Sequence, residues 1–179
     1  ETLGNLWTEY PDCIMQTHLS EQLEEINWVK ELYPKAENYL SVYDKFNLVR
    51  ENSIFGHCIH LSEKELEILE ERNSSVAHCP TSNLFIGSGV FNLRSFNEKK
   101  IKVGLATDTG GGTFFSMLKT MSETYKVSQL SKFSIHAAQL LWLATMGSSS
   151  SLNLENKIGN IEKNYCADLN IINLSSTKE

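Results

Sequence analysis

Three histidines and one aspartate stand at the ends of short apolar runs that have the composition of β-strands. In chain order they are His18 after residues 13–17, His57 at the end of 53–57, His78 at the end of 75–78 and Asp108 after 101–106. Because the carboxyl ends of parallel strands meet at one edge of a sheet, the four side chains are expected to converge. Imidazole and carboxylate together suit zinc, or iron, in an open catalytic site that makes bound water more acidic.

Glu21 follows His18 by three residues and falls on the first turn of the helix expected next. That position places a carboxylate within reach of a bound water, where it can move a proton. The alternative is that Glu21 only complements the positive end of the helix, which is worth about 0.3–1 kcal/mol. A single histidine at a strand end is usually structural, but three histidines and an aspartate in register favour a functional site.

The elements that must position these residues alternate between strand and helix. The helices are expected at 21–33, with Ser20 as the N-cap, and at 39–47, 62–72, 93–99, 116–130 and 134–146. The helix at 62 begins with the capping box Ser62 to Glu65, and a helix-like stretch covers residues 1–10. The serine run 148–151 predicts a loop, and the alternating tail 167–174 predicts a strand of a small accessory sheet. The alternation is typical of an α/β fold with a parallel sheet.

The glycine run 110–112 and the four cysteines carry weaker signals. The glycine run lacks the lysine and the spacing of a phosphate-binding loop, so it favours close approach of the backbone to a small planar ligand. The cysteines show no C-x-x-C spacing, and we interpret them as structural. They are Cys13, Cys58, Cys79 and Cys166.

Composition excludes several classes of protein. The 179 residues include 16 Lys and Arg against 22 Asp and Glu, which gives a net charge of −6 and argues against nucleic acid or an anionic membrane as a partner. No apolar run approaches the ~20 residues of a spanning helix, and the start has no signal-peptide pattern, so a cytoplasmic protein is expected. The chain begins at Glu1 without a methionine, and a longer parent protein is also expected.

Several motifs together resemble the guanine deaminase branch of the amidohydrolase superfamily. They are QTHLSE at 16–21, WVKELYP at 28–34, GHCIHLS at 56–62, HCPTSNLFIGSG at 78–89, GLATDTGGGT at 104–113 and TMSETYKV at 120–127. The resemblance covers nearly the whole chain. It implies half of a (β/α)₈ TIM-type barrel, strands five to eight, over residues 1–147, followed by a loop and the returning strand of an accessory β-sandwich over 148–179.

The resemblance also implies residue roles. His18 and Asp108 resemble the zinc ligands, with iron as the alternative metal. Glu21 resembles the general acid/base that passes a proton from the zinc-bound water to the purine N3, and His57 resembles the histidine that polarises the attacking oxygen. His78 and Asn83 are expected to shape the wall of the substrate pocket. His60 is expected to face away or to cap the following helix.

The implied activity is zinc-dependent hydrolytic deamination of guanine to xanthine and ammonia in purine catabolism. The family's H-x-H pair of zinc ligands, and the arginine and phenylalanine that hold guanine, do not occur here. We therefore expect this chain alone to be inactive, and to act as a homodimer or with the missing N-terminal half. Two alternatives stay open: another aminohydrolase acting on a related purine or pterin, and a non-catalytic half-barrel that serves as an assembly module.

Overall fold

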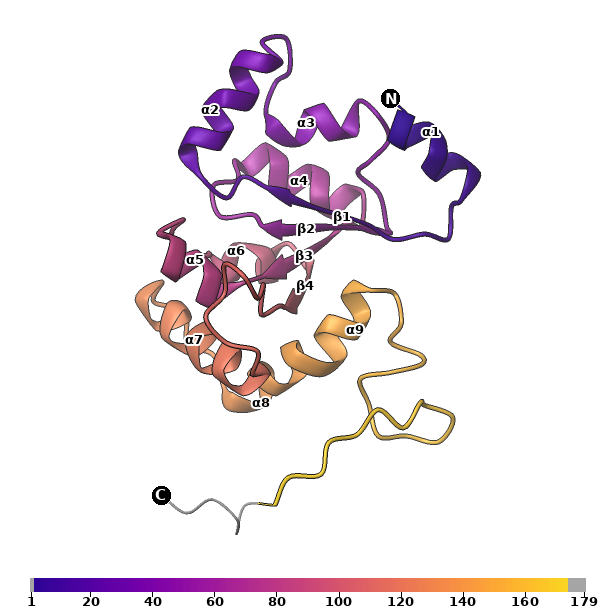
Figure 1. The fold of residues 1–179 in the computed structure, drawn as a ribbon, viewed down its shortest axis with the longest axis vertical. Helices are drawn as coiled ribbons and strands as arrows, with labels where there is room; N and C mark the ends of the chain where they lie inside the picture. The colour runs from indigo at the N-terminus through magenta and orange to yellow at the C-terminus, as the bar shows by residue number, and fades with distance from the viewer. Residues whose placement is uncertain (1, 174–179) are drawn as a thin grey trace.

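A four-stranded parallel β-sheet forms the centre of the protein, in a computed structural model that describes residues 2–173 (Figure 1). The strands pair in the order of the sequence, and they are β1 (Met15–Leu19), β2 (Ser53–His57), β3 (Ser75–His78) and β4 (Lys102–Leu105). All three pairings are parallel, so every strand ends at the same edge. The predicted α/β class is therefore confirmed. Whether these strands are the fifth to eighth of a barrel stays a prediction.

Helices connect the strands and cover the sheet. They are α1 (Thr2–Glu9), α2 (Leu23–Leu32), α3 (Tyr39–Asp44), α4 (Glu63–Glu71), α5 (Pro80–Ile86), α6 (Leu93–Glu98), α7 (Met117–Leu130), α8 (Ala137–Trp142), the π-helix η1 (Leu143–Gly147) and α9 (Ser148–Ser151). Helices α2, α3 and α4 lie on the side of β1 and β2, while α7 and α8 lie beyond β4 (Figure 1). None of the helices in residues 2–173 is long and apolar enough to cross a membrane.

The two faces of the sheet differ in what they carry. On one face Phe55, Val76 and Val103 lie in register and are buried in the core beneath the helices. On the other face His18 lies in register with Gly56, and small residues continue that row across β3 and β4. The apolar face supplies the hydrophobic free energy of folding, and the small-residue face leaves room for His18.

The serine run forms a helix, which overturns the predicted loop at 148–151. Helix α9 continues α8 through the π-helix η1, across the boundary predicted between residues 147 and 148. The hydroxyls of Ser148 and Ser151 donate to the carbonyls of Leu143 and Gly147, and that of Ser149 donates to the Ile158 carbonyl. These serine hydroxyls therefore form hydrogen bonds from within the helical segment, and the low-complexity sequence alone does not predict this.

Two further predictions about local structure are wrong. Residues 167–173 form no strand and are not part of the sheet of the described residues; Leu174 lies outside those residues. Ser20 is not the N-cap of α2: Gln22 takes that place, and Ser20 has a φ of 49° in the turn before it. Helix α5, which starts with Pro80 at its first turn, is an element that the sequence analysis did not include.

Candidate metal centre and active site

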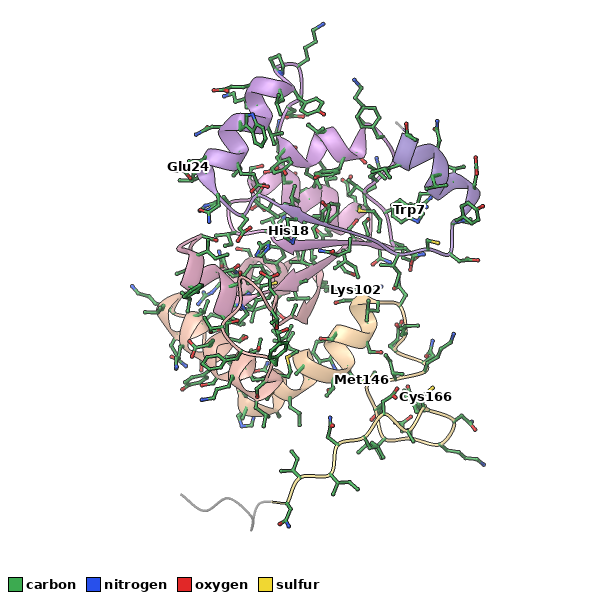
Figure 2. The ribbon with its side chains drawn as sticks, in the orientation of Figure 1. Trp7, His18, Glu24, Lys102, Met146 and Cys166 are labelled. Carbon is green, nitrogen blue, oxygen red and sulfur yellow. The ribbon has the colours of Figure 1, made fainter. Side chains whose placement is uncertain are left out.

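Four of the predicted site residues come together where the strands end. The ligand atoms of His18, Glu21 and His57 all lie within 4.8 Å of one another. His57 Nε2 lies 3.5 Å from Glu21 Oε2 and 3.9 Å from Asp108 Oδ2, so His57 is the centre of the cluster. His18 is labelled near the middle of the molecule, at the carboxyl end of β1 (Figure 2).

His57 is buried and held in one orientation. Its side chain is 1% exposed, and its Nδ1 lies 2.8 Å from Asn83 Oδ1 on α5. Because an amide oxygen only accepts, His57 Nδ1 carries the hydrogen and donates it. The lone pair therefore stands on Nε2, which faces the two carboxylates. The backbone helps to aim the ring, since His57 and Cys58 both have positive φ, 69° and 51°.

The cluster fits a cation. Among the described residues no hydrogen-bond partner is found for the buried His57 Nε2, although two carboxylates stand beside it. An imidazole lone pair facing two carboxylates is unfavourable unless a proton or a metal ion lies between them. Two imidazoles and two carboxylates form a nitrogen and oxygen donor set that suits zinc or iron.

His18 lies on one outer strand of the sheet, β1, and Asp108 follows the other, β4. The His18 ring meets the His57 ring edge to face, with centroids 4.7 Å apart. Gly56 makes this possible, since a Cβ there would stand 3.2 Å from His18 Cδ2. His18 is exposed, and Asp108 is 28% exposed, so the cluster is open to solvent on one side.

The glycine loop wraps closely around Asp108. A Cβ on Gly112 would lie 1.8 Å from the Thr107 carbonyl oxygen, and a Cβ on Gly111 would lie 2.7 Å from Ser82 Oγ. Asp108 itself has a φ of 47°. The glycines therefore let the loop fold tightly on itself so that the carboxylate points at His57. Their approach to a planar ligand stays a prediction.

His78 is not among the residues whose ligand atoms come together in this cluster. Its ring stacks on Phe91 with centroids 4.4 Å apart, and it is 1% exposed. Burial, and to a smaller extent the neighbouring His57, lowers the pKa of His78 to about 3, so this ring is neutral. Neither of its nitrogens has a hydrogen-bond partner in the described residues. Its predicted place in the substrate pocket stays a prediction, and its observed contact is with the core.

Cys79 and Ser88 are two site neighbours that the sequence analysis missed. The Cys79 sulfur lies with the ligand atoms of His57 and Asp108, all within 4.8 Å of one another. Burial raises the pKa of Cys79 to about 12, which keeps it a neutral thiol. Ser88 Oγ donates to Glu21 Oε1 at 2.9 Å. The only sequence signal for Ser88 is its place between two glycines in the GSG motif.

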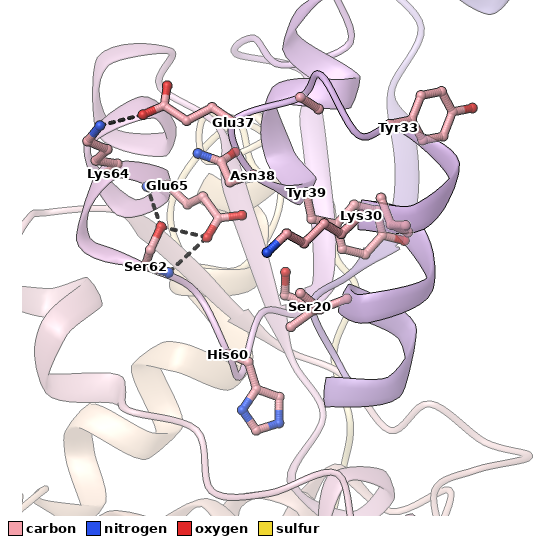
Figure 3. Close-up of a pocket in the computed structure, with 13 residues that line it drawn as sticks. Ser20, Lys30, Tyr33, Glu37, Asn38, Tyr39, His60, Ser62, Lys64 and Glu65 are labelled. Carbon is pink, nitrogen blue, oxygen red and sulfur yellow. Dashed lines mark hydrogen bonds and ion pairs between the residues drawn. The ribbon is translucent and has the colours of Figure 1, made fainter.

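His60 does not cap the following helix. Its Nε2 donates to the Ser88 carbonyl at 2.9 Å, while the predicted capping box of Ser62 and Glu65 closes the start of α4. His60 also lines a separate cavity of about 440 Å³ between α2, α3 and α4 (Figure 3). That cavity is bordered by Ser20 and Lys30, and the four clustered residues are not part of its lining.

Fold and sequence together define the family to which the chain belongs. The sequence profile of the amidohydrolase family matches residues 5–179, and the chain belongs to that family. Within it, the chain is 48% identical to the guanine deaminase of Escherichia coli (strain K12) over 169 residues, which is 94% of this chain and 38% of that protein.

Solved structures agree. A structure of E. coli guanine deaminase has a TM-score of 0.86 and 50% sequence identity, and the match covers 88% of this chain and 37% of that one. The guanine deaminase of C. acetobutylicum, solved with guanine in its active site, has a TM-score of 0.83 and 33% identity over 91% of this chain and 40% of that one. The chain thus spans about two fifths of the length of the relatives it matches.

Proposed function

We propose that this chain supplies one side of an active site that hydrolyses guanine to xanthine and ammonia with zinc. The observation that carries the proposal is the buried lone pair of His57 Nε2, aimed at the carboxylates of Glu21 and Asp108. Guanine as the substrate is supported by the E. coli and C. acetobutylicum relatives. A planar neutral purine also suits a chain with a net charge of −6.

The residues have distinct chemical tasks in this reaction. His18 and Asp108 would hold the metal, with His57 beside them; zinc, when bound, makes water a stronger acid and polarises its oxygen. Iron is the alternative metal for the same donor set. Asn83 fixes the His57 ring so that Nε2 faces the reacting oxygen.

The reaction requires two proton transfers from the attacking water to guanine. Water adds to C2 of guanine, and Glu21 Oε2 takes its first proton and delivers it to the purine N3. Asp108 Oδ2 takes the second proton and gives it to the exocyclic amine, whose bond to C2 then breaks. A C–O bond has replaced a C–N bond, and guanine and water have become xanthine and ammonia.

A chimaera tests this proposal. In it, the matched segment of E. coli guanine deaminase is replaced by this chain, and ammonia release from guanine, adenine, cytosine and a pterin is measured. We expect turnover of guanine, and a fall of about 10²–10⁴-fold in kcat for Glu21→Gln, which cannot take a proton. A folded, metal-loaded chimaera that releases no ammonia would support the assembly-module alternative, and preference for another base would support another aminohydrolase.

The isolated chain gives the second measurement. We propose that it lacks ligands and acts with another copy or with a complementary segment, so the chain with zinc supplied should release no ammonia from guanine. Its solution mass is recorded on the same sample. Turnover by a species of monomeric mass would overturn the proposal that this chain is a partial enzyme. Cytoplasmic localisation stays a prediction of the sequence analysis.

A further inference from the structure

The carboxylate of Glu21 is held by a loop far away in the sequence. Ser88, which is 4% exposed and follows α5, donates its hydroxyl hydrogen to Glu21 Oε1 at 2.9 Å. The other carboxylate oxygen, Oε2, is the one that lies 3.5 Å from His57 Nε2. The serine therefore occupies one oxygen and leaves the other directed into the cluster.

The direction of the Ser88 hydroxyl is itself set by a neighbour. Gln22 Nε2 lies 2.8 Å from Ser88 Oγ and, as an amide N–H, can only donate to it. The serine oxygen thus accepts from Gln22 and turns its hydrogen to Glu21. This chain of two hydrogen bonds gives the Glu21 carboxylate a fixed rotamer rather than a solvated, freely rotating one.

The backbone conformation of residues 87–89 directs Ser88 toward Glu21. The flanking Gly87 and Gly89 have φ values of 79° and 134°, a region that other residues rarely adopt. A Cβ at Gly89 would stand 3.1 Å from Ile59 Cγ2. His60 Nε2 donates to the Ser88 carbonyl at 2.9 Å and fastens the loop from the other side.

We propose that Ser88 is a positioning residue for Glu21, which rests on the proposed function of Glu21 as the proton-transferring group. By holding Oε1, Ser88 keeps Oε2 where a proton has to be taken up and delivered. A purely structural tie between two loops would affect folding instead, and it would leave the rate of the chemical step in the folded enzyme unchanged.

Kinetics of the chimaera separate these roles. We expect Ser88→Ala to lower kcat about 10- to 100-fold with KM changed less than about twofold, since misplacement of a catalytic group by about 1 Å has effects of that size. Ser88→Thr keeps the hydroxyl and should restore most of kcat. Ser149→Ala is the matched control, because it also removes a buried hydroxyl, which donates at 2.8 Å to the Ile158 carbonyl outside the cluster.

A crystal structure of Ser88→Ala in the chain itself gives a readout that needs no activity. We expect Glu21 Oε2 to leave its place beside His57 Nε2. An unmoved carboxylate, an unchanged kcat, or equal losses for Ser88→Ala and Ser88→Thr would each overturn the proposal. If the carboxylate is displaced in the crystal structure but the chimaera does not deaminate guanine, Ser88 still positions Glu21 and the proposed function is rejected.

Discussion

The side-chain amide of Asn83 fixes which ring nitrogen of His57 carries the hydrogen. Asn83 Oδ1 takes the hydrogen of His57 Nδ1, and this choice leaves Nε2 as a base or ligand rather than a donor. Such outer partners orient the ligands of metal sites and raise their basicity. We therefore expect Asn83 to strengthen metal binding through its hold on the His57 ring.

Asn83→Ala should lower the affinity of the chain for zinc about 10- to 100-fold, because the His57 ring loses its orienting acceptor. Competition with a chromophoric zinc chelator measures the affinity directly. Asn92→Ala is the control, since Asn92 is exposed and, among the described residues, its amide bonds the nearby Ser95 hydroxyl alone. Equal affinities for Asn83→Ala and the unchanged chain would contradict this assignment.

His78→Phe should make stability less sensitive to acid. The unfolded chain protonates this histidine near its ordinary pKa of 6.5, whereas the folded chain keeps a pKa of about 3, so acid favours unfolding below pH 6.5. The stacked contact with Phe91 suits phenylalanine equally well. Between about pH 7.5 and 5, the variant should lose about 2 kcal/mol less of its unfolding free energy. Urea unfolding at both pH values measures this, and parallel losses would refute it.

At the scale of elements, α9 covers one main-chain N–H group at the outer edge of β4. The main-chain N–H of Leu105 points away from β3 and donates to Ser148 Oγ at 3.1 Å. Gly104 allows the contact, because its missing Cβ would stand 3.0 Å from Ser148 Cα. An edge N–H that is bonded in this way no longer offers a site for unwanted strand pairing.

Ser148→Ala should lower the unfolding free energy by about 1 kcal/mol and the melting temperature by about 2–4 °C, because the Leu105 N–H loses its acceptor. Ser150→Ala is the matched control on the same helix, for which no side-chain hydrogen bond is found among residues 2–173. Thermal unfolding followed by circular dichroism distinguishes the two. The interpretation fails if both variants melt together.

Short-range sequence patterns predicted most of the helices and strands, whereas contacts between distant residues could not be predicted from the sequence. The capping box of Ser62 and Glu65 was predicted and is present, because its two partners lie three residues apart. Ser88 was missed because it meets Glu21 across 67 positions, a contact that only the folded chain creates. The tail at 167–173 has the alternation of a strand, but a strand also needs a partner, which alternation cannot supply.

At the scale of the whole molecule, the cluster lies on an open side of the sheet. His18 is exposed on β1, which is the outermost strand of the described sheet and is paired only with β2. The relatives of this chain are more than twice as long as the segment that matches it. A complementary segment placed against this side would cover the cluster and exclude water from it, which strengthens the electrostatic interactions inside.

The chain should therefore bind the part of the E. coli guanine deaminase that it does not match. We expect the two to co-purify with a 1:1 mass by sedimentation, and the complex to hold zinc more tightly than the chain alone. The E. coli segment that this chain does match is the control partner. Elution of the chain at an unchanged mass in the presence of the complementary part would contradict the proposed association.

The hydrogen bond from Leu105 to Ser148 also has a consequence for a strand that would add to the outer edge of β4. One hydroxyl holds one N–H there, whereas a strand that pairs along all of β4 forms a ladder with several main-chain groups. The exchange is favourable for a segment that fits the whole edge and unfavourable for a peptide that pairs at a single residue. We therefore expect this one serine to favour a segment that pairs along the whole of β4 over a short peptide.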